Sequence, residues 1–128
     1  MAVPVVATYS TQAKIDAHTA LLALVDSGTA GSVKLRSSAD ALLCTITLTD
    51  PAGSVNGSTG QLTLTQAATV NATATGNVAY AELCDSGGTV HLALPAQQGT
   101  APVSGKFVMN TLAVVSGGPV DLMSMVIG

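Results

Sequence analysis

The hydrophobic pattern of this chain changes its period once, close to Gly31. Before that point apolar residues recur at the spacing of a helix face, and after it they alternate with polar residues, as in strands with one buried face. Residues 10–27 are therefore predicted to form one helix, and residues 31–127 a β-rich body. The body has room for seven or eight short strands, which predicts a mainly β (α+β) fold.

The helix is expected over residues 11–27. Ser10 or Thr11 can cap its N-terminus, and Gly28 follows its last periodic residue. A single helix cannot bury its broad apolar face alone, so we expect the helix to pack on a sheet. The residues of this face are Ala13, Ile15, Ala17, Ala20, Leu21, Leu22, Leu24 and Val25.

The clearest strand covers residues 42–49, with Leu42, Cys44, Ile46 and Leu48 facing inward. A turn is predicted at residues 50–53, a hairpin around residues 85–88 and a loop over residues 95–105. We expect an antiparallel β-sandwich or flattened barrel with the helix packed on it. The other predicted strands cover residues 32–37, 61–65, 77–84, 89–94, 106–115 and 119–127.

Charge is scarce along the whole chain. Only 9% of the 128 residues are Asp, Glu, Lys or Arg, against about a quarter in most soluble domains. The net charge is −3 and the four basic residues are scattered, so neither nucleic acid nor an anionic membrane surface is an expected partner. Residues 1–128 are predicted to form a single domain with a neutral surface that suits contact with other protein copies.

The chain contains no phosphate loop, dinucleotide fingerprint, nucleophile elbow or zinc-protease motif. We therefore predict no enzymatic activity, no catalytic or cofactor-binding residue, no metal site and no small-molecule substrate. His18 and His91 are interpreted as surface positions. Cys44 is expected to be a buried free thiol, and a disulfide between Cys44 and Cys84 is not expected, because it requires that their strands be neighbours.

Residues 1–9 form an apolar N-terminal arm, in which Pro4 and the β-branched valines disfavour a helix. The candidate partner-binding residues are Val3, Val5, Val6 and Tyr9. The arm is either an edge strand of its own sheet or a strand added to a neighbouring subunit. The arm lacks the features of a secretory signal, so we expect synthesis and retention in the cytosol with reduced cysteines.

The order of these segments resembles a family of small accessory virion proteins of tailed bacteriophages. The likeness is carried by the helix AKIDAHTALLALVDSG, the strand GSVKLRS, the segment LLCTITLTDP, the hairpin GNVAYAELCDSGGTV and the closing segment GGPVDLMSMVI. The family usually has more aromatic residues in the central hairpin, where this chain has Ala79, Tyr80 and Ala81.

The resemblance implies a structural protein that is made in the bacterial cytoplasm and resides on the virion. A capsid decoration (cement) protein is the leading expectation, with itself as a homo-oligomer and a phage major capsid protein lattice as partners. A tail or head-to-tail accessory protein is the alternative in the same class. A secreted adhesin-like β binding module is a further alternative, which the absence of a signal sequence disfavours.

Overall fold

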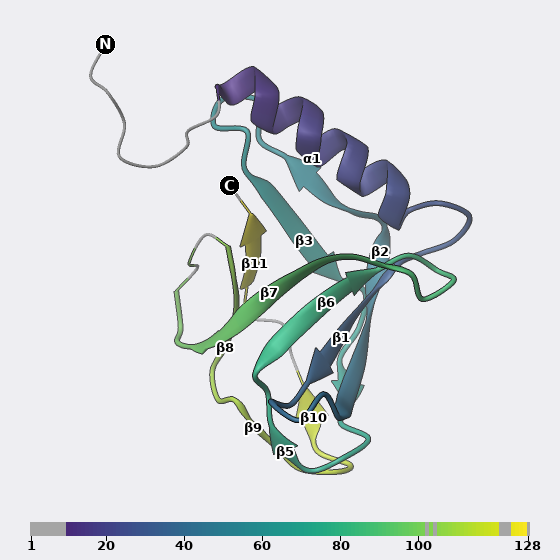
Figure 1. Cartoon of the computed structure of the whole chain (residues 1–128), viewed down its shortest axis with the longest axis vertical. Helices are drawn as coiled ribbons and strands as arrows, with labels where there is room; N and C mark the ends of the chain where they lie inside the picture. Colours follow the sequence, from purple (N-terminus) through teal and green to yellow (C-terminus); the bar gives the residue numbers. More distant parts are fainter. Residues whose placement is uncertain (1–9, 102, 104, 121–123, 128) are drawn as a thin grey trace.

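A computed structural model describes residues 10–101, 103, 105–120 and 124–127. It confirms a mainly β protein with one helix. The helix α1 (Thr11–Val25) lies across one end of the β body, and several very short strands lie at the opposite end (Figure 1). The helix begins where the sequence predicted, because the Ser10 hydroxyl accepts a hydrogen bond from the Ala13 N–H at 3.1 Å.

Seven strands form a closed ring of hydrogen-bonded neighbours in the order β1-β2-β3-β11-β8-β7-β6. All neighbouring pairs are antiparallel except β7 and β8, which run parallel. A ring with an odd number of strands cannot alternate direction throughout, so closing it requires at least one parallel pair. The expectation of a purely antiparallel body is therefore wrong at this pair. The strands of the ring are β1 (Ser32–Arg36), β2 (Leu42–Val55), β3 (Leu62–Gln66), β6 (Tyr80–Cys84), β7 (Val90–Gln98), β8 (Lys106–Met109) and β11 (Ser124–Ile127).

Two small sheets lie outside this ring, at the end opposite the helix (Figure 1). One pairs β4 (Val70–Asn71) with β10 (Pro119–Val120), and the other pairs β5 (Gly76–Asn77) with β9 (Ala113–Val114). Each of two segments predicted as one long strand, residues 106–115 and 119–127, contributes one strand to the ring and one to these small sheets.

Phe107 is the one aromatic side chain among the buried hydrophobic residues described, and it is fully buried; the others are aliphatic side chains, the two cysteines and Met109. Cys44, Ile46 and Leu48 are buried as predicted, but Leu42 is 39% exposed and its neighbour Leu43 is buried. The reason is a bulge opposite Leu35 and Arg36, where the register between β1 and β2 shifts. Such a bulge interrupts the alternation of side chains and turns both Leu43 and Cys44 inward.

Two of the predicted irregular segments lie in strands. Residues 50–53 do not end a strand, because β2 continues to Val55 and passes an irregularity in its register with β3 between Leu48 and Gly53. The backbone of Gly53 packs so closely on Thr63 that no side chain fits there. Residues 95–98, predicted as the start of a loop, continue β7 to Gln98.

Pro95 is compatible with a strand because of the edge to which its nitrogen points. The neighbouring Ala96 N–H donates to the Ala79 carbonyl at 3.0 Å on the β6 side. Amides of successive residues point to opposite edges of a strand, so the nitrogen of Pro95 faces away from β6 and removes no hydrogen bond to that strand.

Candidate interaction surfaces

The sequence-predicted partner-binding residues Val3, Val5, Val6 and Tyr9 lie outside the described residues. The candidate surfaces are therefore built from the body of the molecule. Four features stand out: a polar cluster on β1 and β6, a histidine-supported hairpin, a shallow hollow at the end opposite the helix, and an apolar band below the helix.

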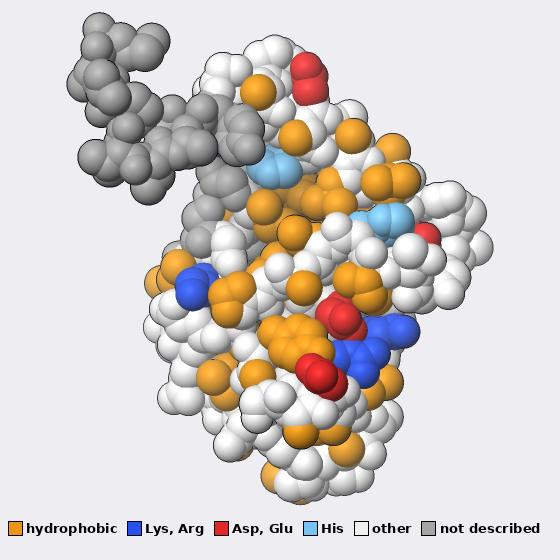
Figure 2. All heavy atoms as spheres, in the orientation of Figure 1, with side chains coloured by type: hydrophobic (Ala, Val, Ile, Leu, Met, Phe, Trp, Pro, Cys, Tyr) orange, Lys and Arg blue, Asp and Glu red, His pale blue; other side chains and the backbone are white. Residues whose placement is uncertain are grey.

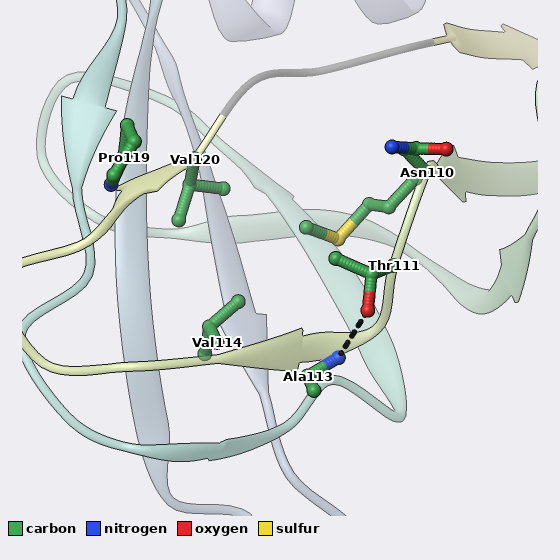
Figure 3. A pocket seen from close by; sticks show the side chains of 7 residues that line it. Asn110, Thr111, Ala113, Val114, Pro119 and Val120 are labelled. Carbon is green, nitrogen blue, oxygen red and sulfur yellow. Dashed lines mark hydrogen bonds between the residues drawn. The ribbon is translucent and has the colours of Figure 1, made fainter.

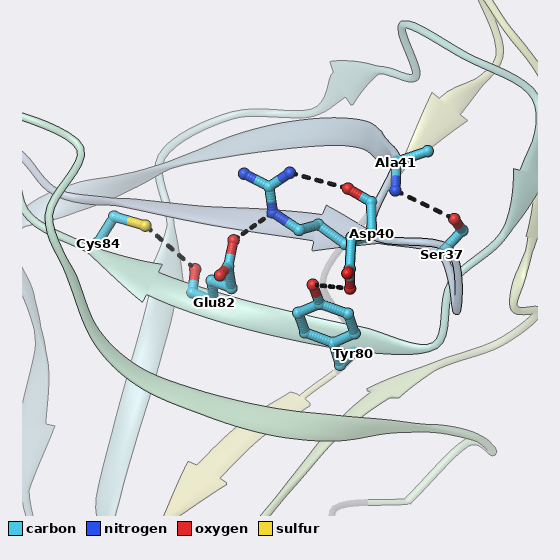
Figure 4. Close-up of polar contacts among 7 residues, drawn as sticks. Ser37, Asp40, Ala41, Tyr80, Glu82 and Cys84 are labelled. Atoms are coloured by element: carbon cyan, nitrogen blue, oxygen red, sulfur yellow. Dashed lines mark hydrogen bonds and ion pairs between the residues drawn. The ribbon is translucent and has the colours of Figure 1, made fainter.

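The polar cluster surrounds Tyr80 on the outer face of β1 and β6 (Figure 4). The Arg36 Nε donates to Glu82, and one of its terminal nitrogens donates to the Asp40 carbonyl at 3.1 Å. The Tyr80 hydroxyl donates to the Asp40 carboxylate at 2.7 Å, and this hydrogen bond raises the pKa of Tyr80. Arg36 thus neutralises Glu82, and the Asp40 carboxylate is held by the hydroxyl of Tyr80.

This cluster fixes the turn between β1 and β2. Asp40 has a positive φ of 65°, a conformation that is unusual outside glycine, and its carbonyl and carboxylate are both held by the cluster. The Ser37 hydroxyl accepts from the Ala39 N–H and from the Ala41 N–H in the same turn, and Figure 4 draws the second of these contacts. The contacts within the cluster account for these residues as a support for the turn between β1 and β2. No ligand is needed to explain them.

The hairpin between β6 and β7 is the one predicted from residues 85–88. The Asp85 carboxylate accepts from the Gly87 and Thr89 N–H groups at 2.9 and 3.0 Å. It also lies 3.1 Å from the His91 Nε2, and the hydrogen bond with His91 is the main cause that lowers the pKa of Asp85. His91 therefore supports this turn from a partly buried position on β7.

His18 also has a structural contact that the sequence did not reveal. Its Nδ1 lies 2.6 Å from the carbonyl oxygen of Gly60, in the turn between β2 and β3. Gly60 has a φ of +75°, and the side chain of Lys14 packs against it. This contact joins the middle of the helix to the body.

The two cysteines are both buried and free. They cannot pair, because β1 lies between β2, which carries Cys44, and β6, which carries Cys84. Adjacent strands are about 5 Å apart, so a strand in between places the two residues beyond disulfide reach. Burial raises the pKa of both thiols, which disfavours the reactive thiolate form.

A hollow of about 260 Å³ opens at the end with the small sheets (Figure 3). None of the side chains that line the hollow is ionisable. A ligand in it would therefore be held by the fit of its shape and by a few neutral hydrogen-bonding groups. The Thr111 hydroxyl is already occupied by the Ala113 N–H at 3.3 Å. The lining residues are Met109, Asn110, Thr111, Ala113, Val114, Pro119 and Val120.

A band of hydrophobic side chains lies just below the helix, between the two histidines (Figure 2). Half-buried residues of α1 and β7 meet the core in this region: Leu21 and Leu22 from the helix, Leu92 and Ala96 from the strand. Val90, at the start of β7, is 44% exposed. The band therefore brings apolar side chains of the helix and of β7 together.

Within the described part of the chain, no three His, Cys, Asp or Glu side chains converge on a possible metal position. Over the same residues, no helix has the length and apolar character needed to cross a membrane. Comparisons of the chain with protein-family models, with curated proteins and with solved structures found no match.

Proposed function

We propose that this protein is a structural component of a tailed-bacteriophage virion, a capsid decoration protein that binds the assembled shell as a homo-oligomer. The proposal takes its class from the order of sequence segments that resembles such proteins. In this proposal the β body is a flattened barrel or sandwich with the helix across one end. Its role is to bind other protein subunits, and it catalyses no reaction.

The observation that supports this most is how charge is distributed over the surface. In a chain with only 9% charged residues, Arg36 and Glu82 form an ion pair, which neutralises two of these charges within the molecule. Neighbouring outer positions of β2 and β3 are exposed threonines: Thr45, Thr47, Thr63 and Thr65. Neutral faces of this kind can pack against other copies or against a shell with little cost for removing charges from water.

The test is binding of the purified protein to phage shells that lack it. We expect saturation at a fixed ratio to the shell subunit, and a shell that survives heating better when coated. Binding should persist at about 1 M salt, since ion pairs that salt would screen contribute little. Binding to isolated tails and not to shells would favour the tail or head-to-tail accessory role, and binding to neither would overturn the proposal.

A further inference from the structure

The strand β7 has one edge that is only partly covered. On one side β6 pairs with it over residues 90–95. On the other side the pairing with β8 involves only residues 96–98. Within the described part of the chain, no strand lies on this second edge over residues 90–95. The edge borders the apolar band below the helix (Figures 1 and 2).

The main chain at this edge is oriented to pair with another strand. Since the Ala96 amide points to β6, the amides of Leu94 and Leu92 do so too, and the backbone of Ala93 faces the open side. The Ala93 side chain is exposed, and Leu92 beside it is half-buried. An added strand would therefore gain main-chain hydrogen bonds and cover apolar side chains at the same time.

We infer that this edge of β7 receives the N-terminal arm, residues 1–9, of a second copy of the chain. The inference rests on the self-association in the proposed function and names the surface that it uses. Nine extended residues reach about 30 Å, whereas residues 90–95 span about 20 Å, so the arm is long enough to pair along the whole edge.

The sequence of the arm fits an outermost strand. Pro4 has no N–H and belongs on an edge that faces solvent, which directs the amides of Val3 and Val5 toward the opposite edge. The arm would pair with β7 through that edge, and Pro4 would prevent a further strand from joining. The exchange therefore ends with one added strand per copy.

The arm is assigned to a second copy because of the residues that join it to the helix. Ala7, Thr8 and Tyr9 lead to the Ser10 cap and include no glycine, proline, asparagine or aspartate, the residues that favour a reversal of the chain. The helix start also lies beside the turn that contains Gly60, whereas β7 begins next to the other end of the helix, where the Ser86 hydroxyl donates to the Ser27 carbonyl at 3.0 Å.

Two variants separate the arm from its docking edge. Deleting residues 2–8 removes the arm, and Ala93→Pro removes the N–H that faces the open edge while keeping the bonds to β6. Ala93→Thr is the matched control, because it keeps that N–H. We expect the full chain and Ala93→Thr to be oligomeric by sedimentation. The deletion of residues 2–8 and Ala93→Pro, the two blocked variants, should each be a folded monomer with at least a tenfold weaker self-association.

Mixing the two blocked variants is the decisive step. The arm of the Ala93→Pro chain can dock on the intact edge of the truncated chain, so the mixture should form a heterodimer. No heterodimer from two folded monomers, or unchanged oligomers in either variant, would overturn the inference. These outcomes are read in solution without a particle, so they are distinct from a failure of shell binding.

A cross-link covers the case in which Ala93→Pro does not fold. Separate chains carrying Val5→Cys and Ala93→Cys are mixed and oxidised, and the native thiols do not compete because both are buried. A disulfide between the two chains, absent when Thr100→Cys replaces Ala93→Cys, supports docking between copies. A bond formed only when both substitutions are in one chain would show that the arm folds back on its own body and would overturn the inference.

Discussion

The carboxylate of Asp26, the residue that ends the helix, accepts the buried N–H of Ala52 in β2, with oxygen distances of 3.0 and 3.3 Å. Ala52 is fully buried and lies in the irregular part of β2 where its pairing with β3 is interrupted. One side chain thus supplies the hydrogen bond that this segment of β2 cannot obtain from its neighbouring strand. It also fixes the end of the helix to the body.

Replacing Asp26 with Ala should destabilise the protein by about 1–3 kcal/mol, because the buried N–H of Ala52 loses its acceptor. Asp26→Asn keeps an acceptor oxygen and should lose less. Chemical denaturation measures both. Asp16→Ala, at an exposed position of the same helix, is the control and should change the free energy of unfolding by no more than about 0.5 kcal/mol. Equal effects at Asp26 and Asp16 would contradict this role.

The helix is predicted to be part of the core through one face only. Leu22→Asp should unfold the domain, because it places a charge against the core. Val25→Ala, at a fully buried position, should cost about 2 kcal/mol, whereas Leu24→Ala, where the side chain is 51% exposed, should cost little. Thermal unfolding checks all three. An unchanged melting temperature for Leu22→Asp would show that the helix does not contribute to the core.

The pairing of Asp85 with His91 predicts a pH dependence of stability. The folded state lowers the pKa of Asp85, so its stabilisation is fully present above the unfolded pKa, near 4, and is lost as the pH falls through the lower folded pKa. By NMR titration, His91→Ala should move the pKa of Asp85 upward. The pKa of Asp85 in this variant should still lie below the usual range of an aspartate, since the N–H groups of Gly87 and Thr89 continue to donate to its carboxylate. An unchanged Asp85 pKa in His91→Ala would exclude the contact.

The local elements of the fold could be predicted from the sequence, but the long-range pairings could not. The Ser10 cap and the turn after Asp85 depend on contacts within a few residues, so their sequence signals are sufficient. The passage of β2 through Pro51 depends on Asp26 and on the close approach of Gly53 to Thr63, which are distant in sequence. Similarly, Pro95 fits into β7 because its nitrogen lies on the edge of the strand that faces away from β6, and the sequence does not show which edge that is.

The same division applies to the candidate surfaces. The low charge and the valine pattern of the arm are visible in the sequence, and they predict association without naming its surface. The open edge at Ala93 follows from the strand order, and specifically from the short parallel pairing of β7 with β8. The contacts of His18 and His91 were missed because a lone histidine gives no signal of its partner.

The proposed virion role is tested most directly by counting this protein in gradient-purified phage particles released from cells that produce it. Quantitative mass spectrometry gives its copy number relative to the major capsid subunit. The account predicts a number comparable to that of the shell subunit. A few copies per particle would contradict the decoration role and point to the tail, and absence from purified particles would contradict a virion function altogether.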